Sequence, residues 1–141
     1  MHVSARTDYT LRAMLAAAAR YPQVVTATTL AVSQGIPHSF LQSILLDLRR
    51  AGLLHSLRGA DGAYALTRAP EKVSVGDVLR ATNGAITTVR GRPAAAAPYP
   101  GLATGLREVW LSVNEAIEGV VDQATLACLL PPRATESPAH G

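Results

Sequence analysis

Cysteine is nearly absent from this chain of 141 residues, which contains only Cys128. A single cysteine excludes a disulfide within the chain, a Cys-x-x-Cys redox pair, and a metal or cluster site built from several thiolates. The four histidines lack the spacing of a metal site, so the sequence predicts no metal and no cofactor. Because its neighbours Ala127 and Leu129 are apolar, Cys128 is interpreted as a small buried hydrophobic residue.

Long apolar runs are missing as well. None approaches the roughly 20 residues needed to span a bilayer. The apolar segment 14–19 resembles the core of a signal peptide only faintly, and Arg20 closes it, so an ordinary helix is favoured. We therefore expect a cytoplasmic protein with no membrane partner.

Aromatic side chains make up only 4% of the sequence, although hydrophobic residues make up 48% and much of that share is alanine. This composition allows a core, but a thin one, and it favours closure of the core by a partner subunit. The length suits one domain, or one domain with an appendage.

Charged residues are also few, at 16%, and they are unevenly distributed. Residues 1–80 contain nine Arg or Lys against five Asp or Glu, whereas residues 81–141 contain four against five. A basic half favours a nucleic-acid partner, although a merely solvated surface can carry the same bias. The residues Asp8, Asp47, Asp61 and Asp77 are scattered among helix and turn positions, and no serine or cysteine has an obvious catalytic base near it. No catalytic site is therefore predicted, and we do not expect an enzyme.

The most informative stretch is 30–66, which predicts two helices separated by a tight turn and followed by two short strands. The second helix is expected to begin at Pro37 and to stop before Gly52, because proline suits the first helical position and glycine suits the end. Within it, apolar residues recur with helical spacing and define one buried stripe. These residues are Leu41, Ile44, Leu45 and Leu48.

The two strands are predicted at 54–58 and 63–66, on either side of the turn Gly59-Ala60-Asp61-Gly62. Alternation along the second strand places Tyr64 and Leu66 on a buried face. The fold class is therefore mainly α with a small β-hairpin wing, namely a winged helix-turn-helix plus a long C-terminal dimerisation helix.

The flanking segments complete this organisation. Ser4 is a candidate cap for a helix that runs to Arg20, and Ser74 with Asp77 predicts a helix to about residue 82. Proline, glycine and alanine from 89 to 101 argue against regular structure there. We predict a DNA-binding domain at 1–85, a Pro/Ala-rich linker at 86–101, a dimerisation helix at 102–130 and a disordered tail at 131–141.

The predicted long helix spans some twenty residues and carries an apolar stripe wider than a coiled-coil seam. We interpret this stripe as a dimer interface, with Trp110 as an anchor. Its residues are Leu106, Val109, Trp110, Val113, Ile117, Val120 and Val121.

The outward side of the second helix of the pair carries the candidate base readers Ser39, Gln42 and Ser43, because glutamine and serine can bond base edges. A solvated helix face is the alternative. Further residues are candidates for contact with phosphate or, at the wing tip, for contact with the minor groove. These are Arg6, Tyr9, Thr28, His38, Arg49, Arg50, Arg58 and Gly59, and for Tyr9 a place in the core is about equally supported.

Three stretches together resemble one known family. The segments VSARTDYTLRAMLAAA, IPHSFLQSILLDLRRAGLLHSLRGADGAYAL and VSVGDVLRATNG resemble the Rrf2 family of bacterial transcription regulators. The resemblance implies a homodimer in which each subunit offers a winged helix-turn-helix to half of a palindromic site. It places Arg58 and Gly59 on the wing, Ser39 and Gln42 on the recognition helix, and Tyr9 at the aromatic position of the first helix.

The chain departs from the family pattern at two points. Ala63 stands where the wing usually has a second glycine. Cluster-binding members have three cysteines between the fourth helix and the long helix, whereas residues 89–101 contain none, which excludes a cluster held by those thiolates.

The leading hypothesis is a homodimeric regulator of transcription that binds double-stranded DNA, favoured as a repressor. Its signal is either a small-molecule effector held between the winged domain and the long helix, or no ligand at all. One alternative is a winged-helix protein-interaction module that has lost DNA binding. Another is a thiol-based redox sensor that uses Cys128.

Overall fold

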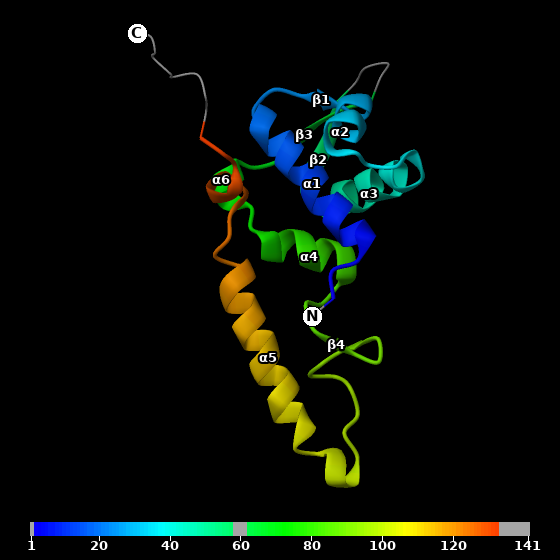
Figure 1. The fold of residues 1–141 in the computed structure, drawn as a ribbon, viewed down its shortest axis with the longest axis vertical. Coiled ribbons are helices and arrows are strands. Elements are labelled where there is room, and N and C mark those ends of the chain that lie inside the picture. Colours follow the sequence, from blue (N-terminus) through cyan, green and yellow to red (C-terminus); the bar gives the residue numbers. More distant parts are fainter. Residues whose placement is uncertain (1, 58–61, 133–141) are drawn as a thin grey trace.

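The computed structural model describes residues 2–57 and 62–132, and they form a winged domain from which one long helix, α5, extends away (Figure 1). The wing-tip candidates Arg58 and Gly59 lie outside the described residues, as does the predicted tail beyond residue 132. The predicted fold class is confirmed. Among the described residues, no helix combines the length and the apolar character needed to cross a membrane.

Helix α1 (Ala5–Arg20) lies at the centre of the winged domain and contacts α2, α3, α4, α6 and the sheet. Ser4 caps it as predicted, because the Ser4 side chain accepts a hydrogen bond from the Thr7 N–H. Its inner face is fully buried at Ala13 and Met14. The alanine-rich sequence therefore allows neighbouring helices to approach α1 closely.

The helix-turn-helix consists of α2 (Ala27–Gln34) and α3 (His38–Arg50). Gly35 makes the turn with a φ of 63°, a left-handed conformation that glycine adopts without strain. The predicted stripe of α3 is buried at all four positions. Pro37 is the N-cap rather than the first helical residue, a shift of one position from the prediction.

The sheet has three antiparallel strands in the order β1-β3-β2, where β1 is Val25–Thr26, β2 is Leu54–Leu57 and β3 is Ala63–Leu66. The sequence predicted the hairpin but not the short β1. The predicted alternation in β3 is wrong at Ala65, which is buried like Tyr64 and Leu66. Because β3 is the central strand, its small alanine is covered as well.

After the 3-10 turn Pro70–Lys72, α4 (Val75–Asn83) begins with the predicted capping box. The Ser74 side chain accepts from the Asp77 N–H, and the Asp77 carboxylate accepts from the Ser74 N–H, each at 3.0 Å. Gly84 ends this helix. The local signals of capping and termination were thus sufficient to predict α4.

Regular structure within 89–101 was not predicted, and here the structure corrects the sequence analysis. Strands β4 (Thr88–Val89) and β5 (Arg92–Pro93) form a small antiparallel hairpin. Arg90 and Gly91 make its turn with φ values of 53° and 82°, the two positive values that suit a two-residue hairpin. Proline is tolerated in β5 because this hairpin has only edge strands.

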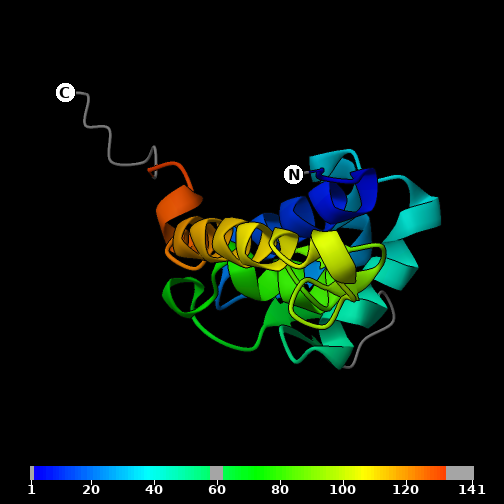
Figure 2. The same ribbon diagram turned by 90° about the horizontal axis from the view of Figure 1, so that it is seen from below.

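Helix α5 (Leu106–Val121) follows the 3-10 turn Gly101–Ala103 and has 16 residues, fewer than the twenty or so expected. All of α5 lies within the described residues, and none of its side chains is buried. Seen from below, α5 crosses in front of the winged domain (Figure 2).

The chain returns to the winged domain in α6 (Leu126–Leu129), which Thr125 caps. Leu126 is fully buried in the main core. Cys128 was predicted to be buried, but it is exposed. The reason is geometric, since Cys128 lies two residues after Leu126 and thus about 200° further round the helix.

Candidate nucleic-acid interface

The outward face of α3 is the first part of the candidate site. Ser39, Gln42 and Ser43 are all exposed there, opposite the buried stripe. The Pro37 cap provides no side-chain hydrogen bond, although the Phe40 N–H donates to the Pro37 carbonyl oxygen at 3.0 Å. The N-terminus of a helix attracts an anion such as phosphate. His38, at the start of α3, and Thr28, near the start of α2, are exposed as well.

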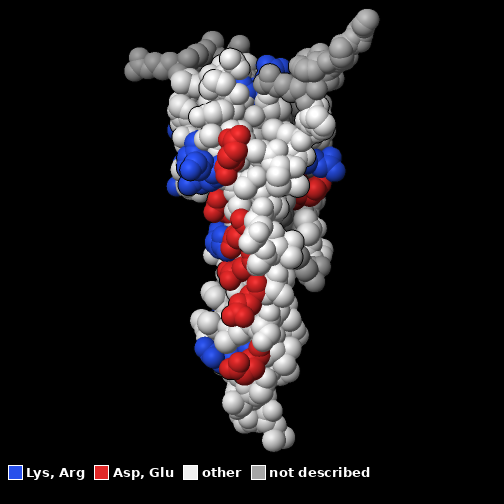
Figure 3. Space-filling view, turned by 90° about the vertical axis from the view of Figure 1, so that its left-hand side faces the viewer, with Lys and Arg blue, Asp and Glu red and all other residues white. Residues whose placement is uncertain are grey.

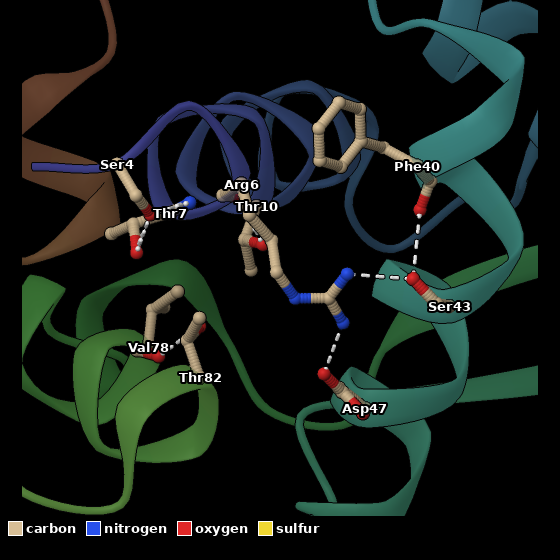
Figure 4. A network of polar contacts seen from close by, with 9 residues as sticks. All are labelled: Ser4, Arg6, Thr7, Thr10, Phe40, Ser43, Asp47, Val78 and Thr82. Carbon is tan, nitrogen blue, oxygen red and sulfur yellow. Dashed lines mark hydrogen bonds and ion pairs between the residues drawn. The ribbon is translucent and has the colours of Figure 1, made fainter. Parts of the chain in front are cut away.

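Hydrogen bonds and an ion pair connect the start of α1 to α3 (Figure 4). The Arg6 guanidinium donates to Ser43 Oγ at 2.6 Å and also forms an ion pair with the Asp47 carboxylate. Arg6 was predicted as a phosphate contact on the strength of its position alone. The structure places it between two residues of α3, which are 37 and 41 positions further along the chain.

Asp47 is the one acidic residue of α3, and its side chain is 35% exposed. A carboxylate on a helix that approaches DNA repels the phosphate backbone unless a cation neutralises it. Arg6 supplies that cation and fixes Ser43 at the same time. Sequence reasoning missed this pair, because the contact joins two separate helices.

Tyr9 packs against Phe40, with ring centroids 5.3 Å apart and the rings tilted by 53°. The Tyr9 side chain is half-buried against the core. Of the two roles considered for Tyr9, packing between α1 and α3 is the one for which the structure provides contacts.

The C-terminal end of α3 forms a second part of the candidate site. Exposed Arg49 and Arg50 border a shallow hollow together with Leu46 of α3 and with His55 and Ser56 of β2. Sequence reasoning overlooked His55 and Ser56. Their signal was two adjacent polar residues, both exposed, in a strand that runs directly from α3 toward the wing.

The surface on the side of α5 has the opposite character (Figure 3). Figure 3 shows acidic side chains in a row along this surface. The acidic residues of α5 and its end recur at spacings of seven, three and four, which place them on one side of the helix; they are Glu108, Glu115, Glu118 and Asp122. A row of carboxylates repels DNA. The charge distribution therefore favours an approach of DNA from the side of α3.

Arg80 connects this acidic face to the winged domain. Its guanidinium donates to both carboxylate oxygens of Asp122, at 2.8 and 2.9 Å, and to Glu118 at 3.2 Å. The hydrogen bonds from Arg80 lower the pKa of Asp122. Gly76 makes room for this contact, since a Cβ there would lie 1.8 Å from Asp122 Oδ1. These contacts attach α5 to α4.

The predicted dimer stripe of α5 is divided in the structure. Trp110, Val113 and Ile117 line a pocket against the winged domain. Val109 and Val120 do not line this pocket, and they are 50% and 70% exposed. Leu106 is also exposed, and Val121 is half-buried.

A helix-turn-helix followed by an antiparallel hairpin, with a polar outward face on the second helix, defines the class of winged helix-turn-helix DNA-binding proteins. The model of the Rrf2 family, described as iron-dependent transcriptional regulators, matches residues 3–132. The chain therefore belongs to the Rrf2 family. It is a DNA-binding transcription regulator and not an enzyme.

Individual relatives agree with this assignment. A Mycobacterium tuberculosis protein named as an HTH-type transcriptional regulator is 39% identical over 128 residues, which cover 90% of this chain and 80% of the relative. The structure of CymR, titled the global cysteine regulator of B. subtilis, aligns with a TM-score of 0.75 at 27% identity, covering 92% of this chain and 95% of CymR. T. potens IscR aligns with a TM-score of 0.69 at 28% identity, covering 96% of each chain.

Proposed function

We propose that this chain is a homodimeric repressor that binds a palindromic operator and works without a cysteine-ligated cluster. The observation that carries the proposal is the outward face of α3, where exposed Ser39 and Gln42 stand beside Ser43, which Arg6 holds in place. Glutamine can bond adenine bidentately, and serine can bond several bases. Exposed Arg49, Arg50 and His38 provide phosphate contacts at the two ends of the same helix.

The wing completes the proposed contact. Arg58 and Gly59, which lie outside the described residues, keep the role that the sequence predicted for them, contact with the minor groove. The described residues before and after them are antiparallel strands, since β2 ends at Leu57 and β3 begins at Ala63, and Gly62 has a φ of 62°. Titration with duplexes from the regulated promoters tests the proposal, because affinity falls steeply with salt when phosphates are bound.

The role of Arg6 yields a specific prediction. Arg6→Ala is expected to weaken DNA binding on the order of tenfold, because it leaves the Asp47 charge unpaired on α3. The double variant Arg6→Ala/Asp47→Ala is expected to recover most of that loss, to within about threefold of wild type. Fluorescence anisotropy with a labelled duplex measures both values.

Asp47→Ala alone is the matched control, and it should bind DNA at least as tightly as the wild type. If the double variant stays as weak as Arg6→Ala, the neutralising role is contradicted. Arg6 then contacts phosphate directly, as the sequence position suggested.

The proposed dimer interface includes the exposed apolar residues Val109 and Val120 of α5. Val120→Glu is expected to raise the dimer dissociation constant on the order of 100-fold, because it removes apolar burial and introduces a charge in both subunits. Ser112→Glu, which adds the same charge at an exposed polar position outside the stripe, should leave dimerisation nearly unchanged. Sedimentation equilibrium measures both constants, and a wild type that sediments as a monomer contradicts the dimer.

A thiol sensor is a second candidate, favoured by two observations. Cys128 is exposed, and the structure of a protein titled a cysteine regulator has the same fold. Because this chain has no second cysteine, oxidised Cys128 would pair with another molecule. An oxidant effect on DNA affinity that persists in Cys128→Ala rules this role out.

A further inference from the structure

The orientation of α5 relative to the winged domain depends on polar contacts more than on a packed core. All of α5 is described, and none of its side chains is buried. Where α5 faces the winged domain, Trp110, Val113 and Ile117 line a hollow. Among the described residues, the side-chain hydrogen bonds and ion pairs that join α5 and its end to the winged domain are those of Arg80 with Glu118 and Asp122.

The Arg80 guanidinium contacts α5 at two successive turns. Two of its nitrogens donate to the two carboxylate oxygens of Asp122, at 2.9 and 2.8 Å, and one of them also donates to Glu118 at 3.2 Å. Because Glu118 and Asp122 are four residues apart, they lie on the same side of α5. A planar guanidinium that pairs with both carboxylate oxygens fixes direction as well as distance. The contact therefore restricts rotation of α5 about its own axis.

A second attachment lies at the start of α4, where two backbone segments form an isolated antiparallel bridge. The Val75 N–H donates to the Ala124 carbonyl oxygen, and the Leu126 N–H donates to the Val73 carbonyl oxygen, each at 2.8 Å. Arg80 lies five residues after Val75, on the next turn of α4. With both attachments, α5 can pivot about the link at 122–124 only if the Arg80 contact breaks.

Helix α4 connects this constraint to the DNA-binding face. Val78 and Leu79 of α4 are buried, and α4 packs against α1 and α3. Since α4 is part of the winged domain, an α5 that is fixed on α4 is also fixed relative to α3.

The Arg80 contact is better suited to positioning than to stability. The side chains of Arg80 and Glu118 are each 37% exposed, and that of Asp122 is 42% exposed. Exposed ion pairs contribute little to stability, whereas bidentate geometry adds specificity. Gly76 leaves the space that the Asp122 carboxylate occupies, because a Cβ there would lie 1.8 Å from Asp122 Oδ1.

We propose that Arg80 is a positioning residue for DNA recognition, which fixes α5 on the winged domain and thereby sets the spacing of half-sites that the dimer accepts. The inference rests on the proposed function, because it requires two winged domains joined through α5. One added base pair moves the half-sites about 3.4 Å apart and rotates one against the other by about 35°. A dimer with a fixed α5 therefore rejects the wrong spacing.

The experiment measures binding of the full-length protein to duplexes that wild type has selected from a random pool. The selected palindrome is compared with the same sequence after one central base pair is added or removed, and with a single half-site. Arg80→Met keeps an unbranched apolar chain but removes the guanidinium. Gly76→Ala keeps both charges and displaces the Asp122 carboxylate, and it does not weaken α4, since alanine favours a helix over glycine.

Arg107→Met is the matched control, because it removes an exposed arginine of α5 that makes none of these contacts. We expect the wild type and this control to prefer the selected spacing by a factor of about ten or more. In Arg80→Met and Gly76→Ala this preference should fall below about threefold, because α5 can then pivot and the two winged domains reach several spacings. Affinity for the single half-site should stay within about twofold of wild type in every variant, since one winged domain is enough to bind it.

A wild type that tolerates every spacing, or variants that keep its full preference, overturns the inference alone, because the protein still binds as a dimer. Equal losses on the half-site and on the palindrome in Arg80→Met and Gly76→Ala also overturn it, because Arg80 then supports the winged domain itself. A wild type that binds the palindrome no more tightly than the half-site contradicts the proposed dimer, and the inference fails with it.

Discussion

Replacing Arg49 and Arg50 together by alanine is expected to weaken binding to every duplex, on the order of 100- to 1,000-fold near physiological salt. Both arginines are exposed in the last turn of α3 and border the hollow shared with β2. If each contacts one phosphate, a dimer loses about four contacts, and the slope of log affinity against log salt falls by about 3.6. Anisotropy titrations at several salt concentrations measure both effects.

The matched control removes two positive charges elsewhere. Arg92→Ala/Arg107→Ala changes exposed arginines of β5 and α5, on the part of the chain that extends away from α3. Its DNA affinity should remain within about threefold of wild type, because screening limits the reach of a surface charge to roughly 10 Å. An equal loss in both double variants contradicts the assignment of Arg49 and Arg50 to the interface.

Leu48→Ala is expected to lower the free energy of unfolding by about 2–5 kcal/mol. Leu48 is fully buried on the inner side of α3, where it belongs to the main core. Since domains of this kind are stable by only about 5–15 kcal/mol, the variant approaches the threshold of unfolding. Urea unfolding followed by circular dichroism measures the difference.

Leu46→Ala provides the comparison on the same helix. Leu46 is 40% exposed, so its truncation should change the free energy of unfolding by no more than about 0.5 kcal/mol. Similar losses in the two variants would mean that α3 is oriented differently from the structure, with Leu46 also buried.

The helices could be predicted because their signals are local. The stripe from Leu41 to Leu48 has the helical period, Ser4 and Ser74 cap helices that begin directly after them, and Gly35 permits the sharp turn. Each of these signals acts within a few residues, so the sequence alone carries it. The outward placement of Ser39 and Gln42 follows from the same period.

The features that the sequence could not predict depend on contacts between distant segments. The pairing of Arg6 with Asp47 joins positions 41 residues apart, and no local pattern specifies it. The pocket lined by Trp110, Val113 and Ile117 forms only because α5 lies beside the winged domain. The β4–β5 hairpin was not predicted because the proline and alanine content of the segment argued against regular structure. Its turn also consists of Arg90-Gly91 instead of the usual Asn-Gly.

The most direct test of the central claim, that α3 reads bases through its outward face, is selection of binding sites from a random pool of duplexes. The wild type and Gln42→Ala are compared in parallel. We expect a two-fold symmetric consensus for the wild type, and for the variant the same consensus without its preference at one adenine in each half. If both proteins select identical sites, or neither selects any, the outward face of α3 does not read DNA sequence.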